Sequence, residues 1–197
     1  MHINSHFALG VIIASLFNSY FHFNLIEFSI IVLFSFVCDF DVFISKFAKD
    51  NNHRMLITHS IIPSLIILFL GLTLNWIVLI IAGISYSIHI LFDTLDWGTN
   101  FFYFQKKQVG LKFLISKEEF ENLSKYLSKY NNPASFFDEK YYKNKICVGF
   151  EICLFILMMI IITIYAIEYI LITLLYFPFI WFHLTRHFHL KKMETIS

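Results

Sequence analysis

Seven of the histidines and aspartates in the first half of the chain form a candidate set of ligands for divalent metal ions. His89 and Asp93 are four residues apart, so on a helix both point to one side and can hold the same ion. Imidazole and carboxylate groups suit Zn²⁺, with Mn²⁺ or Fe as alternatives, and need no thiolate. We predict one or two ions and favour two, because seven ligands exceed what one catalytic zinc needs. The predicted ligands are His6, Asp39, Asp41, His53, His59, His89 and Asp93.

Hydrolysis is the chemistry that such a site favours. A bound ion lowers the pKa of water, which can then attack phosphorus or a carbonyl carbon near neutral pH. Arg54 lies within the same histidine-rich stretch and is expected to hold a phosphate or a developing oxyanion. Asp39 and Asp41 would point about 200° apart on a regular helix. Either that helix ends there, or one aspartate binds metal while the other orients a ligand. Glu151 is a further candidate for the site.

The composition places these residues in a membrane protein. The chain of 197 residues is 58% hydrophobic and 15% charged, and its mean hydropathy is +0.68. A soluble domain has about a quarter charged residues. The net charge of +1 gives no indication of a nucleic-acid partner. Three cysteines without regular spacing predict neither disulfides nor a zinc finger, and we expect buried thiols. Cys38 directly precedes Asp39, which leaves a minor role at the site open.

Apolar segments divide the chain into three regions, and the expected fold class is an all-α polytopic membrane bundle of about six transmembrane helices. Region 1–97 holds the first four helices and the metal-site motifs. The run 58–92 is too long for one span, so we expect a turn near 71–75. Region 98–145 is a polar cytoplasmic insertion, and region 146–197 holds two more helices and a basic tail.

Two local features of the later regions are predicted from spacing. Ser116 and Glu119 form a capping box for an amphipathic helix over 116–130, whose role as a lid or a connector stays open. The last apolar run should turn near 166–168, and Pro178 should kink the final helix.

The basic residues predict the orientation in the membrane. Of the 15 Lys and Arg, three lie in 46–54, nine in 106–145 and three in 186–192, and the three predicted turns on the other face hold none. The positive-inside rule therefore predicts a multi-pass protein of the cytoplasmic (inner) membrane with both termini cytoplasmic. All seven predicted ligands then lie at the cytoplasmic face. The segment 7–21 is short, and if it does not cross, His6 lies on the opposite face from the others.

Four short motifs resemble the membrane-bound metal-dependent hydrolase family typified by YdjM. They are SHFALG at 5–10, DFD at 39–41, HRMLITHS at 53–60 and HILFDTLDWG at 89–98. The resemblance implies a membrane-integral protein with a metal site and a hydrolytic activity, and it implies the same seven ligands. Cys38 stands where the family tends to have proline. Asp96 stands where it usually has threonine, which adds a possible ligand or catalytic base.

We therefore expect a metal-dependent hydrolase with its site at the inner headgroup level. Its partners would be membrane lipid and an amphiphilic or small-molecule substrate, such as a phospholipid or another phosphate ester, with no nucleic acid. The alternative is a divalent-metal transporter, or a metal-binding membrane protein without catalysis. A transporter is expected to hold its ligands near the bilayer midplane. No feature of the sequence indicates an oligomeric state.

Overall fold

Apolar runs of helix build most of the molecule. The computed structural model describes residues 2–48, 52–105 and 107–195, and these ranges contain helices, loops and one isolated antiparallel bridge between Thr99 and Val109, but no strand. The elements are α1 (Ile3–Phe21), α2 (Leu25–Phe34), η1 (Val37–Phe47), η3 (His53–Met55), η4 (Ile57–His59), α3 (Ile61–Thr73), α4 (Ile77–Asp96), α5 (Lys117–Glu121), α6 (Leu123–Leu127), α7 (Pro133–Lys143), α8 (Lys145–Tyr165), η5 (Ile167–Leu175) and α9 (Tyr176–Thr195), where η marks a 3₁₀-helix.

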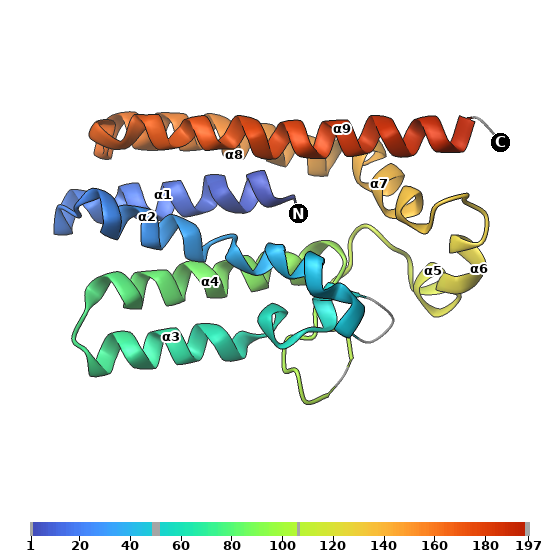
Figure 1. Cartoon of the computed structure of the whole chain (residues 1–197), viewed down its shortest axis with the longest axis horizontal. Coiled ribbons are helices and arrows are strands. Elements are labelled where there is room, and N and C mark those ends of the chain that lie inside the picture. The colour runs from blue at the N-terminus through green and yellow to red at the C-terminus, as the bar shows by residue number, and fades with distance from the viewer. Residues whose placement is uncertain (1, 49–51, 106, 196–197) are drawn as a thin grey trace.

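The long helices lie side by side along one direction. Figure 1 shows α1, α2, α3, α4, α8 and α9 arranged in this way, with α5, α6 and α7 gathered at one end. The predicted turns are confirmed, because α3 ends at Thr73 and α8 ends at Tyr165. The main contacts join α3 to α4, α1 to α8, and α2 to both α1 and α4. Helix α4 thus lies inside the bundle, while α8 lies at its edge.

The structure supports only part of the predicted count of six membrane spans. Among the described residues, three helices are long and apolar enough to cross a membrane, and a fourth span is counted if α2 and η1 cross as one bent element. Half of the apolar window of α4 is buried, against 17% for that of α8. Helix α3 has 13 residues, which corresponds to about 20 Å. It is therefore shorter than the hydrocarbon core of about 30 Å.

Close approach, rather than apolar area, holds α3 against α4. Lipid chains are as apolar as the side chains they would replace, so small residues and polar contacts determine which helices associate. A Cβ atom on Gly71 would lie 2.7 Å from the backbone nitrogen of Ile80. The hydroxyl of Ser87 donates to Ser64 at 2.9 Å between the same two helices. The cluster of buried apolar side chains elsewhere joins α1, α2, α4, α8, η5 and α9.

Two predicted helices are broken in the structure. The segment 25–47 bends by 43° between α2 and η1, near Ser35, whose hydroxyl bonds the carbonyl of Val32. A serine that bonds its own helix in this way competes with the regular ladder. The helix expected over 116–130 is divided into α5 and α6 at Asn122, although the predicted capping box of Ser116 and Glu119 is confirmed.

The final helix and the insertion also differ in detail from the prediction. Pro178 lies in the first turn of α9, and the preceding η5 is a 3₁₀-helix, so the irregular stretch precedes the proline. Pro178 explains why η5 is not a regular α-helix. In an α-helix its ring would clash with the carbonyl four residues earlier, and proline has no backbone N–H to donate. The insertion contains a further helix, α7, whose first turn begins at Pro133 behind the Asn132 cap.

Candidate metal centre

The ends of four apolar segments bring the predicted ligands together. His6 lies in the second turn of α1, Asp39 lies on η1, His59 ends η4, and His89 and Asp93 lie one turn apart on α4. Of these five residues, all but Asp39 are almost completely buried, with 0% to 1% of their surface exposed. Residues separated by up to 87 positions therefore share one buried volume.

Gly10 allows α1 to approach this point. A Cβ atom at this position would lie 2.1 Å from the hydroxyl of Ser35 and 3.0 Å from the carbonyl of Val32. Any larger residue would push α1 away from the end of α2. One turn earlier on α1, the ring of His6 stacks on the ring of His89, with 3.6 Å between their centroids.

Asp93 is the centre of the cluster. Its Oδ1 atom lies 3.2 Å from Nε2 of His6. Its Oδ2 atom lies 3.3 Å from Nε2 of His59 and 3.5 Å from Nε2 of His89. The Oδ1 atom of Asp39 faces the last two nitrogens, at 3.7 and 3.6 Å. Three imidazoles and a second carboxylate thus lie around Asp93, and four of these residues, His6, Asp39, His89 and Asp93, form one close group.

The far nitrogens of two imidazoles are bound by other groups, which orients the rings. Nδ1 of His89 lies 2.7 Å from the backbone carbonyl of Ser35, and a carbonyl only accepts, so Nδ1 carries the proton. Nδ1 of His59 lies 2.7 Å from Asp41, whose carboxylate also accepts from the hydroxyl of Thr58. Such partners fix the tautomer and leave Nε2 with a free lone pair.

The chemistry of the donor set fits a metal ion. Among the residues that the structure describes, the buried Nε2 atoms of His6, His59 and His89 form no well-aligned hydrogen bond, although carboxylate oxygens of Asp93 lie 3.2 to 3.5 Å away. Buried polar atoms without partners are rare and costly in folded proteins. Ligand atoms from His6, Asp39, His89 and Asp93 all lie within 4.8 Å of one another, so these residues could hold an ion.

A second group borders the first. Asp41, His53 and His59 also offer ligand atoms within 4.8 Å of one another, and the rings of His53 and His59 meet edge to face at 5.0 Å. Metal binds the neutral form of an imidazole. Because Asp41 orients His59, it serves as a positioning residue or as a ligand of a second ion.

Arg54 pairs with Asp96 and also contacts Asp93 at the centre of the cluster. Nη1 of Arg54 donates to Asp96 at 2.8 Å, and Nη2 lies 3.3 Å from Oδ1 of Asp93. Asp96 also accepts from the backbone N–H of Trp97 at 2.6 Å. Within the described residues, Asp96 belongs to none of the groups that could hold a metal. Asp96 is thus an ion-pair partner of Arg54, and its role as an extra ligand or base stays a prediction.

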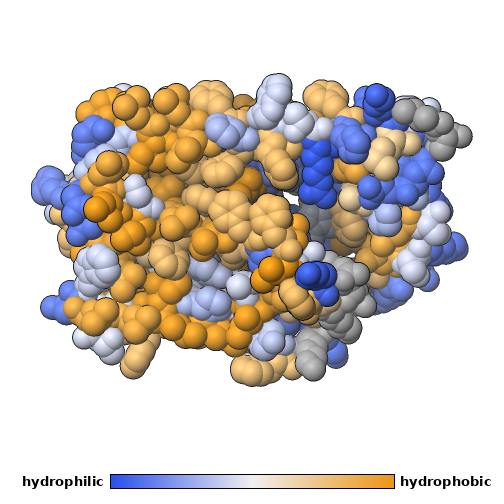
Figure 2. Space-filling model, viewed as in Figure 1, coloured by the Kyte–Doolittle hydropathy of each residue, from blue (hydrophilic) through white to orange (hydrophobic). Residues whose placement is uncertain are grey.

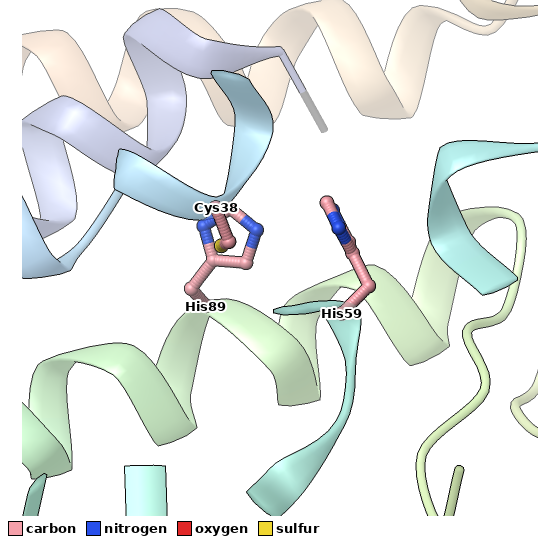
Figure 3. Close-up of side chains that lie close together, drawn as sticks. All are labelled: Cys38, His59 and His89. Carbon is pink, nitrogen blue, oxygen red and sulfur yellow. The ribbon is translucent and has the colours of Figure 1, made fainter. Parts of the chain in front are cut away.

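The prediction of a buried thiol is confirmed for Cys38 but not for Cys153, which is exposed, and Cys38 also lies in the cluster. Figure 3 shows its side chain beside His89, with His59 facing both, and ligand atoms of the three lie within 4.8 Å of one another. The thiol is buried, with 3% of the residue exposed. Its position directly before Asp39 was the only available signal, because the contact with His59 depends on how η1 packs.

Glu151 lies elsewhere. Its carboxylate accepts from Asn4 and from the hydroxyl of Tyr141 at 2.7 Å, and within the described chain it belongs to none of the possible metal groups. The structure therefore places this candidate in a separate polar contact between α1, α7 and α8.

A large cavity adjoins the cluster. Its volume is about 1160 Å³, and Asp39, His53 and Arg54 form part of its wall. Asp39 is the most exposed member of the central cluster, with 15% of its side chain accessible. The surface is hollowed between the apolar helical body and the more polar end that the insertion forms (Figure 2). Aromatic and aliphatic side chains from η1, α5, α6, α7 and α9 line the rest, among them Phe40, Phe43, Phe120, Leu123, Phe137 and Phe179.

Comparison with known proteins identifies a family. Residues 1–170 match the family described as YdjM inner membrane protein. No curated protein and no solved structure matches the chain. The match covers α1 to α8 and the start of η5, and so includes every member of the His/Asp cluster.

Proposed function

The chain belongs to the YdjM inner membrane protein family, and on that premise we propose that it is a metal-dependent hydrolase acting on a phosphate-ester amphiphile. The observation that carries the proposal is the convergence of three imidazole nitrogens on two carboxylates beside a mostly apolar cavity. Membrane location comes from the family and from the apolar helices.

The proposed topology has six crossings with both termini in the cytoplasm. The crossings would be α1, α2 with η1, α3, α4, α8, and η5 with α9. In its support, the insertion helices α5, α6 and α7 and the C-terminal end of α9 lie at the same end of the bundle in Figure 1. Basic residues concentrate on the cytoplasmic side of membrane proteins. The short α3 would be completed by η3 and η4, in which Arg54 and His59 are buried. Non-helical backbone at membrane depth is tolerated where it is buried in protein or lines a cavity.

The proposed centre would be held by His6, Asp39, His59, His89 and Asp93. A divalent ion bound there would supply Lewis-acid activation of water and of a phosphoryl oxygen. Asp41 and the Ser35 carbonyl hold the imidazole rings in place, and Arg54 holds Asp93 and Asp96. Burial of the imidazoles restricts water to the side on which Asp39 meets the cavity.

The cavity supports an amphiphilic substrate. Phenylalanines of η1 and α9 line it beside the cationic residues Arg54 and Lys107. Apolar walls suit a hydrocarbon chain, and guanidinium or ammonium groups suit a phosphate. The substrate would enter from the membrane with its headgroup directed toward Asp39.

Metal analysis and hydrolysis on the purified full chain test the proposal. We expect about one or two Zn or Mn ions per chain, and chelator-sensitive release of phosphate or a phosphorylated headgroup from phospholipid vesicles. Asp93→Asn should lose both. Asp138→Asn should keep its metal, because Asp138 pairs with His187 outside the cluster. Wild-type protein that folds without metal would contradict the centre, and metal uptake into sealed vesicles without hydrolysis would support a transporter instead.

A further inference from the structure

The chain contains only two arginines among its 15 basic residues, Arg54 and Arg186, and both line the same cavity. All the other residues in this set are lysines. A guanidinium differs from an ammonium because its planar set of donors matches the oxygens of a phosphate or carboxylate in pairs. The placement of both arginines at one cavity therefore points to anion recognition there.

The two arginines differ in what they contact. Arg54 is buried and bonded to Asp93 and Asp96. Arg186 lies exposed on α9, and within the described residues no ion pair or hydrogen bond of its side chain is found. Asp138, which also lines the cavity, is bound to His187 at 2.5 Å. Glu151 accepts from Asn4 and Tyr141, and among the described residues neither carboxylate forms an ion pair with Arg186.

A second unpartnered group lies on the same wall. His183 precedes Arg186 by three residues, so both occupy one face of α9. Its ring stacks on His2 with 4.0 Å between centroids and 1° between planes, which fixes its orientation. Nε2 of His183 is buried and has no hydrogen-bond partner in the described part of the chain. His2 and His183 both line the cavity, and Lys107 adds another positive charge to its wall.

We propose that His183 and Arg186 form a second anion site, which holds an anionic group of the substrate other than the one at the His/Asp cluster. The inference rests on the proposed function and narrows its substrate class to amphiphiles with two anionic groups, of which a lipid diphosphate is the simplest. Both residues lie beyond residue 170, outside the range matched to the family. The second site is therefore a feature of this chain's own α9 rather than of the matched region.

Fluorescence of Trp97 can report binding, because this side chain lines the cavity and packs edge to face on Phe137 at 5.1 Å. The other two tryptophans, Trp76 and Trp181, are replaced by phenylalanine. The full chain in detergent is titrated with dodecyl phosphate and with dodecyl diphosphate in the presence of zinc. We expect the diphosphate to bind roughly 10- to 100-fold more tightly, as expected for hydrogen bonds to a charged group.

Substitutions on α9 assign that preference. Arg186→Ala should remove the preference for the diphosphate, because it lowers the affinity for that ligand only. Arg186→Lys should restore part of the preference, because the charge returns without the paired donors. Lys191→Ala, on the same helix and away from the cavity, should leave it unchanged. Circular dichroism of each variant checks the fold. An Arg186→Ala variant that binds the diphosphate as tightly as the wild type does would overturn the second site.

A repeat in chelator separates this inference from the hydrolase proposal. Without zinc the monophosphate has only the α9 site to occupy, so Arg186→Ala should then weaken both ligands. If the metal centre does not exist, zinc will change none of these affinities, while the effect of Arg186→Ala persists. If the α9 site does not exist, the Arg186→Ala variant will bind each ligand with the same affinity as the wild type, both with and without zinc.

Discussion

The two walls of the cavity differ in how their charges are satisfied. On the wall formed by η1, η3 and α4, Arg54 is bonded to two carboxylates, and two imidazoles are each held through Nδ1. On the wall formed by α9, Arg186 and Nε2 of His183 have no such partner among the described residues. The first wall is thus preorganised by its own contacts, whereas the second has groups available for a ligand.

The difference shows that two chemically similar residues can serve different ends in one cavity. Removing one partner of a buried ion pair destabilises the fold, because it leaves the other charge buried without compensation. An exposed cation without a partner contributes little to folding and can be used for binding. Stability measurements should therefore separate the two walls before any activity is measured.

The largest expected effect is on Arg54. Arg54→Met should lower the free energy of unfolding by about 3–5 kcal/mol, because it removes the guanidinium from two buried carboxylates. Arg186→Met should change it by less than about 0.5 kcal/mol, as a surface substitution does. Denaturant titration of the purified protein in detergent measures both. Equal losses of unfolding free energy in the two variants would contradict the claim that only the first wall is held together by its own contacts.

Next in size is the close approach of α1 that brings His6 to the first wall. Gly10→Ala should cost about 1–3 kcal/mol and weaken metal binding, because the new methyl group overlaps Ser35 and displaces α1. Gly149→Ala on α8 is the matched control, since a Cβ there meets nothing within 4 Å. It should be neutral or stabilising by about 1 kcal/mol at most. Metal affinity that survives Gly10→Ala would mean that His6 is not a ligand.

A smaller effect is expected at Asp41, which orients His59. Asp41→Asn should weaken metal binding by about 10- to 100-fold while the fold is retained. Changing the hydrogen-bond partner of a metal-bound histidine typically lowers the metal affinity by this factor. Competition with a chromophoric chelator measures the affinity, and Asp138→Asn is the control. A complete loss of one ion from a two-ion site would instead identify Asp41 as a direct ligand.

The smallest effect concerns the insertion that closes the cavity beside the second wall. Lys140 on α7 donates to Glu119 on α5 at 2.5 Å, and this bond, with the capping serine, lowers the pKa of Glu119. The stabilisation is therefore present above the ordinary pKa of 4.5 and is lost as the pH falls through the lowered value. Glu119→Gln should cost at most about 1 kcal/mol at pH 7. Glu121→Gln, whose contact with Lys117 is exposed, should cost nothing measurable.

The helical class, the membrane location and most helix ends could be predicted from the sequence. Run length and capping residues are local properties, so the turns near 73 and 166 and the cap at Ser116 follow from neighbours in the chain. The break of α2 from η1 could not be predicted in this way. Apolar composition continues across Ser35, and the spacing does not show that its hydroxyl bonds the carbonyl of Val32.

The sequence by itself also determined which residue types are available for a metal site and that the ends of their helices should meet. Only the tertiary structure decided their partners: Asp96 with Arg54, Cys38 with His59 and His89, and Glu151 with Asn4 and Tyr141. It also decided that the chain's two arginines share a cavity. The physical reason is that periodicity specifies the face and depth of a side chain, whereas its contacts depend on helices that are distant in sequence and approach to within a few ångströms.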